Sequence, residues 1–92
     1  MARIEIYTKQ RCPYCNRAVR LLESKGLVFE QYDITEDDPK RIEMISRAKG
    51  RLTVPQIFVD GRHIGGSDDL VALEQAGRLD PMLMLTTPVE EE

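Results

Sequence analysis

Residues 3–34 read RIEIYTKQRCPYCNRAVRLLESKGLVFEQYDI. Apolar and polar side chains alternate over residues 3–8, with Ile4 and Ile6 on one side, and this alternation predicts a strand with one buried face. Residues 28–34 are rich in β-branched and aromatic side chains and predict a second strand. The segment between the two strands is long enough for a helix, so the strands should run parallel. The stretch therefore predicts a β-α-β unit.

The helix of this unit should start at Cys12-Pro13 and end at Gly26. Proline is favoured at the first helical position, since that position has no backbone hydrogen bond to lose. Glycine is favoured just after a helix, where the chain often adopts a left-handed conformation. The side chains predicted on the apolar face are Cys15, Ala18, Val19 and Leu22, and those predicted on the other face are Arg17, Arg20, Glu23 and Lys25.

A second, shorter helix is predicted next, with Asp38 as its N-cap and Pro39 at its first position. Gly50 should end it. Its expected apolar stripe is Ile42, Ile45 and Ala48. Two short apolar runs, residues 56–59 and 62–64, are then separated by Asp60-Gly61, a pair typical of a tight hairpin turn.

A third helix should begin at residues 67–68, with Ser67 or Asp68 as its cap and Leu70, Leu73 and Ala76 on its apolar face. After about residue 77 the sequence suggests at most one more helical turn. The predicted fold is α/β, with the order β-α-β-α-β-β-α, a four-stranded mixed sheet and helices on both faces. We expect residues 1–85 to form this domain and residues 86–92 to form a flexible acidic tail.

Composition limits the possible functions. The 92 residues suffice for one domain, and 13 basic against 16 acidic side chains give a net charge of −3. No broad positive field exists to attract nucleic acid or an anionic membrane. The start of the chain lacks the apolar core of a signal peptide, and no apolar run approaches the length of a membrane span. We therefore expect a cytoplasmic protein, monomeric at this size.

The two cysteines, Cys12 and Cys15, are too close together to stabilise the fold as a structural bridge. A thiol reacts as thiolate, and the free N–H groups at a helix start favour the charged form of Cys12. Cys15 lies one turn further into the helix, where burial should raise its pKa. We expect Cys12 to attack and Cys15 to resolve, because a C-x-x-C pair within a β-α-β unit indicates redox chemistry.

A zinc site and an inert disulfide are the alternatives. A structural zinc ion needs four ligands, and beyond the two cysteines the chain offers a single imidazole, His63. We expect His63 to be a surface or hydrogen-bonded strand residue instead. No metal site is predicted.

Three motifs together resemble the glutaredoxin family, specifically its short bacterial dithiol type: Cys12-Pro13-Tyr14-Cys15, Thr53-Val54-Pro55 and Gly65-Gly66-Ser67-Asp68-Asp69. The resemblance extends from Arg3 to about Leu83. It implies a thioredoxin-like fold and glutathione-dependent thiol–disulfide exchange. Thioredoxin itself has a Trp before its first active-site Cys, whereas this chain has no Trp.

The resemblance also implies a glutathione site. Lys9 and a basic residue of the second helix, best matched by Arg41 with Lys40 adjacent, would hold the glycine carboxylate. Asp68, Asp69 and the backbone N–H groups that follow Gly66 would receive the γ-glutamyl group. Each of these charges could instead be merely solvated or serve the helix dipole.

Nearer the sulfur atoms, the resemblance implies that Tyr14 flanks the reacting sulfur. It also implies that Pro55 is cis beside the cysteines. Val54 would then present its backbone N–H and C=O to the incoming disulfide in the manner of a strand, and Thr53 of the same motif is expected among the glutathione-binding residues. Without the resemblance, a trans proline at the start of a strand would be expected. Ser67 stands where several relatives have a further Cys.

The implied co-substrate is glutathione, with no tightly bound cofactor. The implied partners are glutathionylated or disulfide-containing proteins, among them ribonucleotide reductase. Two rival functions remain open. One is a hydrogen donor reduced by thioredoxin reductase. The other is an iron–sulfur carrier, in which two chains each supply Cys12 and glutathione supplies the remaining thiolates.

Overall fold

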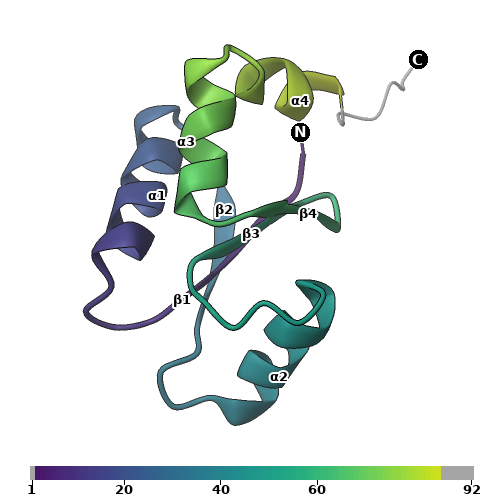
Figure 1. Ribbon diagram of the computed structural model, residues 1–92. Coiled ribbons are helices and arrows are strands. Elements are labelled where there is room, and N and C mark those ends of the chain that lie inside the picture. Colours follow the sequence, from purple (N-terminus) through teal and green to yellow (C-terminus); the bar gives the residue numbers. More distant parts are fainter. Residues whose placement is uncertain (1, 86–92) are drawn as a thin grey trace.

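The computed structural model describes residues 2–85, which form four strands and four helices (Figure 1). In chain order they are β1 (Ile4–Thr8), α1 (Pro13–Ser24), β2 (Phe29–Asp33), α2 (Asp38–Arg47), β3 (Gln56–Val59), β4 (Arg62–Gly65), α3 (Ser67–Gln75) and α4 (Leu79–Leu85). The predicted order is confirmed, and α4 is added to it. The predicted tail, residues 86–92, lies outside the described residues.

The strands form one mixed sheet in the order β2-β1-β3-β4. β1 and β2 are parallel, as a helical crossover requires, and the other two pairings are antiparallel. Tyr7 on β1 lies opposite Gln56 on β3, and Ile4 lies opposite Val59. The loops at the Tyr7–Gln56 end of this pair are those that hold the cysteines and Pro55.

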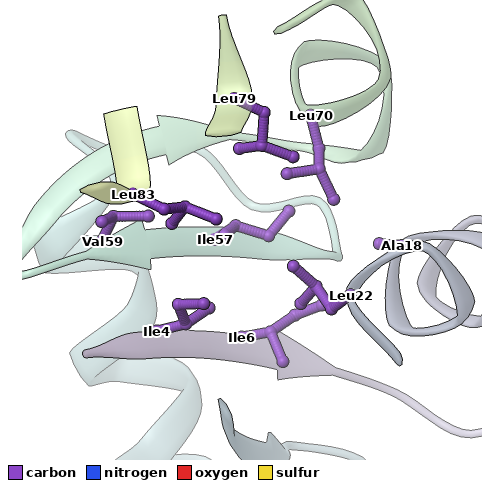
Figure 2. Close-up of a cluster of buried hydrophobic side chains, with 9 residues drawn as sticks. All are labelled: Ile4, Ile6, Ala18, Leu22, Ile57, Val59, Leu70, Leu79 and Leu83. Atoms are coloured by element: carbon purple, nitrogen blue, oxygen red, sulfur yellow. The ribbon is translucent and has the colours of Figure 1, made fainter. Parts of the chain in front are cut away.

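Helices cover both faces of the sheet, as predicted. Helices α1, α3 and α4 pack on one face (Figure 1), around a cluster that Figure 2 shows in close-up: Ile4, Ile6, Ala18, Leu22, Ile57, Val59, Leu70, Leu79 and Leu83. Helix α2 covers the other face with a second cluster: Tyr7, Ile34, Met44, Ala48 and Phe58. Because both faces are covered, all five residues of β1 are buried, including Glu5 and Thr8. The prediction of a single buried face was wrong.

Two details of α2 also differ from prediction. Its N-cap is Asp37 rather than Asp38, and the Asp37 carboxylate accepts from the Lys40 N–H at 3.0 Å. Ile42 is 63% exposed, whereas Met44 is fully buried. The buried stripe runs through residues 44 and 48, which are one turn apart and so share a face.

The start of α3 and the presence of α4 are further differences. Gly66, and neither Ser67 nor Asp68, is the N-cap of α3, and the Asp69 carboxylate accepts from the Gly66 N–H at 2.8 Å. Pro81 does not prevent α4, because it falls in the first turn, where no backbone N–H is needed. Ala76 is exposed, since it is the C-cap of α3.

Lys25, predicted on the solvent side of α1, is largely buried at the end of that helix. Its ammonium lies 2.8 Å from the Glu74 carboxylate and 2.7 Å from that of Asp80. It thereby joins the C-terminal end of α1 to α3 and α4. Within residues 2–85, none of the helices is both long and apolar enough to span a membrane.

Candidate active site

The two cysteines lie at the start of α1 in different surroundings. Cys12 is the N-cap and is half-buried, and its Sγ accepts from the Cys15 N–H at 3.2 Å. Cys15 is 2% exposed. Its pKa is raised, first by burial and then by its hydrogen bond with Cys12. The pair therefore consists of one accessible sulfur that receives an N–H bond and one shielded thiol that keeps its proton, as predicted.

The Thr53–Pro55 loop faces the accessible sulfur. The Val54–Pro55 peptide bond is cis, which confirms the expectation. The Val54 carbonyl oxygen lies 3.9 Å from Cys12 Sγ. The backbone of this loop therefore lies within reach of a disulfide that binds at Cys12.

A cavity of about 220 Å³ opens between this loop and the start of α3. It is lined by Tyr14, Arg51, Thr53, Val54, Pro55, Gly66, Ser67, Asp68 and Asp69. Seven of these nine were predicted as glutathione-binding residues, and the structure brings them together from three separate segments. Arg51 and Ser67 were not predicted.

The two predicted cations do not line this cavity. Lys9 follows β1 and Arg41 lies in the first turn of α2, and both side chains are exposed. Lys40 lies over the Tyr32 ring at 4.5 Å and contacts Glu43. The roles of Lys9 and Arg41 toward a ligand stay predictions.

Each of the two carboxylates at the start of α3 is paired with an arginine. Arg17 Nη2 lies 2.7 Å from Asp68 Oδ1, and its Nε donates to the Ser67 hydroxyl at 3.0 Å. Arg51 Nη1 lies 3.5 Å from Asp69 Oδ2. The helix start therefore presents alternating positive and negative groups, which suits a ligand that is itself a zwitterion.

Arg17 was predicted to lie on the exposed face of α1, which is confirmed, but its contacts with α3 were not predicted. It extends across to α3, and its guanidinium lies 5.4 Å from the centre of the Tyr14 ring. Arg51 was missed as well. A sequence signal existed for Arg51 alone, because it stands two residues before the Thr53–Pro55 motif.

Glycine is required at position 65 both by the backbone conformation and by the atoms that lie around it. Its φ is +126°, a backbone conformation that residues with a side chain rarely adopt. A Cβ at this position would also overlap the Asp69 carboxylate, whose Cγ would be only 2.6 Å away. The glycine thus lets Asp69 fold back onto the Gly66 N–H. This contact fixes one wall of the cavity.

His63 is a hydrogen-bonded strand residue, as expected. Its Nε2 lies 2.6 Å from Gln56 Oε1, and its ring stacks on Phe58 with centroids 5.0 Å apart. Among residues 2–85, no group of three or more His, Cys, Asp or Glu side chains is arranged to hold a metal ion.

Four features together define the class of protein: the order of the strands, the half-buried cysteine at a helix start, the shielded second thiol and the cis proline beside the two cysteines. It is that of thiol–disulfide exchange proteins with a thioredoxin-like fold.

Comparison with known proteins makes the assignment specific. The glutaredoxin family model matches residues 4–64. Glutaredoxin 3 of Escherichia coli K12 is 59% identical over 83 residues, which cover 90% of this chain and 99% of that protein. A probable glutaredoxin of Synechocystis is 52% identical over 82 residues, covering 89% and 93% of the two chains. The chain belongs to the glutaredoxin family and is a thiol–disulfide oxidoreductase, with Cys12 and Cys15 as its two thiols.

Solved structures agree with the fold. The solution structure of a Brucella melitensis glutaredoxin superposes with a TM-score of 0.78 at 48% identity, covering 90% of this chain and 89% of that one. A buckwheat glutaredoxin–glutathione complex superposes with a TM-score of 0.81 at 28% identity, covering 91% and 78%.

Proposed function

We propose that this protein reduces glutathione mixed disulfides and protein disulfides, with glutathione as the electron donor. The observation that most supports the proposal is the cavity beside Cys12, whose backbone loop and paired charges match the groups of a small, zwitterionic tripeptide. The buckwheat relative, solved as a complex with glutathione, has the same fold. The co-substrate would bind reversibly, with no tightly bound cofactor.

In the proposed reaction with a glutathionylated protein, the Cys12 thiolate attacks the glutathione sulfur. The bond between that sulfur and the protein sulfur breaks, and the protein leaves as a thiolate that takes up a proton. Cys12 is then joined to glutathione. A second glutathione thiolate attacks the glutathione sulfur of this intermediate, which releases oxidised glutathione and regenerates the Cys12 thiolate.

With a protein disulfide, Cys12 first forms a mixed disulfide with the client. Cys15 then loses its proton and attacks Cys12, which releases the second client thiol and leaves a Cys12–Cys15 bridge. Two glutathione molecules reduce this bridge. The raised pKa of Cys15 suits this order, because a protonated thiol does not compete with Cys12 for the first attack.

In the proposed binding mode, Thr53, Val54 and Pro55 align the tripeptide backbone. Asp68, Asp69 and the N–H groups after Gly66 receive the γ-glutamyl end, and Tyr14 flanks the sulfur. Lys9 and Arg41 are the cations proposed for the glycine carboxylate. Arg51 joins this set because it lines the cavity.

The test is the reduction of hydroxyethyl disulfide by glutathione, coupled to glutathione reductase. Cys12→Ser should abolish the activity, whereas Cys15→Ser should retain activity toward glutathione mixed disulfides and lose it toward protein disulfides. Activity in Cys12→Ser, or complete loss in Cys15→Ser toward mixed disulfides, would contradict the assigned roles.

A parallel assay with NADPH and thioredoxin reductase in place of glutathione tests the electron source. We expect turnover with glutathione and little with thioredoxin reductase, since the cavity offers charged partners for a tripeptide. The proposed clients are glutathionylated or disulfide-containing proteins of the cytoplasm, with ribonucleotide reductase one candidate, and the proposed active form is a monomer.

A further inference from the structure

Gln56 is a fully buried polar side chain directly after Pro55, at the start of β3. A buried amide destabilises a protein unless its polar atoms are hydrogen-bonded. The other residues of β3, Ile57, Phe58 and Val59, are buried and apolar, so Gln56 is the exception on this strand. The presence of a buried amide at this position is therefore explained by its hydrogen-bond partners.

The hydrogen bonds of Gln56 fix its orientation. Its Nε2 lies 2.9 Å from the Thr53 carbonyl oxygen and 3.2 Å from the Thr53 hydroxyl. A carbonyl oxygen only accepts, so the NH₂ group faces Thr53 and Oε1 faces His63. Oε1 also only accepts, so His63 Nε2 donates, at 2.6 Å. The three residues form one directional chain from β4 to the loop.

His63 is itself held in place. It lies opposite Phe58 in the β3–β4 pairing and stacks on that ring. Burial, followed by the nearby Arg51, lowers its pKa, which favours a neutral imidazole at neutral pH. The chain of bonds is thus anchored to the sheet at one end and to the Thr53 backbone at the other.

Thr53 and Val54 line the cavity, and the Val54 carbonyl oxygen lies 3.9 Å from Cys12 Sγ. We propose that Gln56 and His63 are positioning residues, which hold the Thr53–Pro55 loop in the orientation that binds the glutathione moiety of the substrate. The inference rests on the proposed function. Neither side chain lines the cavity beside Cys12, so they would act through Thr53.

The test variant is Gln56→Met, which keeps the volume of the side chain and removes its hydrogen bonds to Thr53 and to His63. We expect the KM for a glutathionylated peptide to rise about fivefold, the effect of about one lost hydrogen bond, with a smaller change in kcat. The rate at which iodoacetamide alkylates reduced Cys12 should stay close to wild type, because the start of α1 is untouched.

Two further variants separate positioning from general stability. His63→Phe keeps a ring to stack on Phe58 but cannot donate to Gln56, and it should raise the same KM. If the two residues act as one unit, the double variant should be no worse than Gln56→Met alone. Ile57→Val, the next residue along β3 and equally buried, should lower the melting temperature without changing the KM.

The outcomes are distinguishable. A wild-type protein without glutathione-dependent activity overturns both the proposed function and this inference. An active wild type with an unchanged KM in Gln56→Met overturns the inference alone. It is also overturned if Ile57→Val raises the KM as much as Gln56→Met does, because the effect would then follow from stability.

Discussion

Cys12 and Cys15 are one helical turn apart, yet they meet different surroundings. The Cys12 sulfur is reachable and accepts an N–H bond, whereas the Cys15 sulfur is packed beneath α1, where burial raises its pKa. The same three-residue spacing that lets the sulfurs meet also places one at the surface and one in the core.

This asymmetry predicts selective alkylation. At neutral pH, iodoacetamide should label Cys12 in the folded, reduced protein and leave Cys15 unlabelled until denaturant exposes it. Mass spectrometry of the digested protein measures both sites. Equal labelling of the two thiols in the native protein at neutral pH would contradict the shielded position of Cys15.

Gly65 and Gly61 offer a matched comparison at the residue scale. Both have positive φ, but a Cβ on Gly61 would meet no atom within 4 Å, whereas one on Gly65 would overlap Asp69. We expect Gly61→Ala to cost about 1 kcal/mol of unfolding free energy. Gly65→Ala should cost about 2 kcal/mol or more and raise the KM for glutathione substrates, since Asp69 must move. Equal losses would show that Asp69 adapts freely.

Sequence reasoning found the motif residues and missed those that support them. The cysteines, the Thr53–Pro55 loop and the two aspartates belong to short local patterns. Arg17 is different, because its partners Ser67 and Asp68 lie 50 and 51 positions away. A surface-like charge on a helix does not reveal which distant loop it will contact.

At the scale of the element, α2 is fastened to the sheet by polar as well as apolar contacts. Arg47 Nη2 lies 2.9 Å from Glu5 Oε1, and Arg47 Nη1 donates to the Tyr7 hydroxyl at 2.7 Å. The Tyr7 hydroxyl in turn donates to Glu43, and the Arg47 guanidinium lies 4.1 Å from the centre of the Phe58 ring. Arg47 therefore neutralises a carboxylate that the sheet buries.

Removing this arginine should be costly. Arg47→Met should lower the unfolding free energy by about 2–4 kcal/mol, because Glu5 would remain buried without its main partner. Arg41→Met, on the exposed side of the same helix, should change it by less than about 0.5 kcal/mol. Chemical denaturation of both variants measures the difference. A double variant, Glu5→Met with Arg47→Met, should recover part of the loss.

The same helix shows why one position of its apolar stripe was mispredicted. Ala48 is buried and Ile45 packs against the second cluster, as predicted, but Ile42 is exposed. The sheet face opposite α2 contains Glu5 and Tyr7, so the helix turns Arg47 toward it and leaves Ile42 in solvent. The order and type of the elements followed from local patterns, but the rotation of α2 depended on a partner strand.

At the scale of the whole molecule, the groups whose pKa is shifted on folding predict that stability is greatest near neutral pH. The pKa of Glu5 is lowered chiefly by its hydrogen bond with Arg47, that of Glu43 by Tyr7 and that of Asp33 by Thr35. A lowered folded pKa gives stability that is present above the ordinary carboxyl value and lost as pH falls through the folded value. Stability should therefore decline below about pH 4.

Stability should also decline at alkaline pH, because the pKa of one buried group is raised rather than lowered on folding. The raised pKa of Cys15 gives stability that is complete below the ordinary thiol value, about 8.5, and lost as pH rises toward the folded value. Denaturation measured across the pH range should show both declines. Glu5→Gln should flatten the acid decline and Cys15→Ala the alkaline one, and an unchanged acid slope in Glu5→Gln would rule out Glu5 as its source.

Strand β1 runs from one end of the sheet to the other, and the reacting cysteine lies at only one of these two ends. The Ile4–Val59 end of the sheet lies beneath Leu83 of α4, whereas Cys12 and Pro55 follow from the Tyr7–Gln56 end (Figures 1 and 2). Ala2 and α4 are thus on the side away from the reacting sulfur. A fluorescent reporter or a surface linker joined at Arg62, which is exposed and lies opposite Val59 at this end, would leave the entrance to Cys12 open. This placement makes the small domain suitable as the exchange unit of an immobilised sensor.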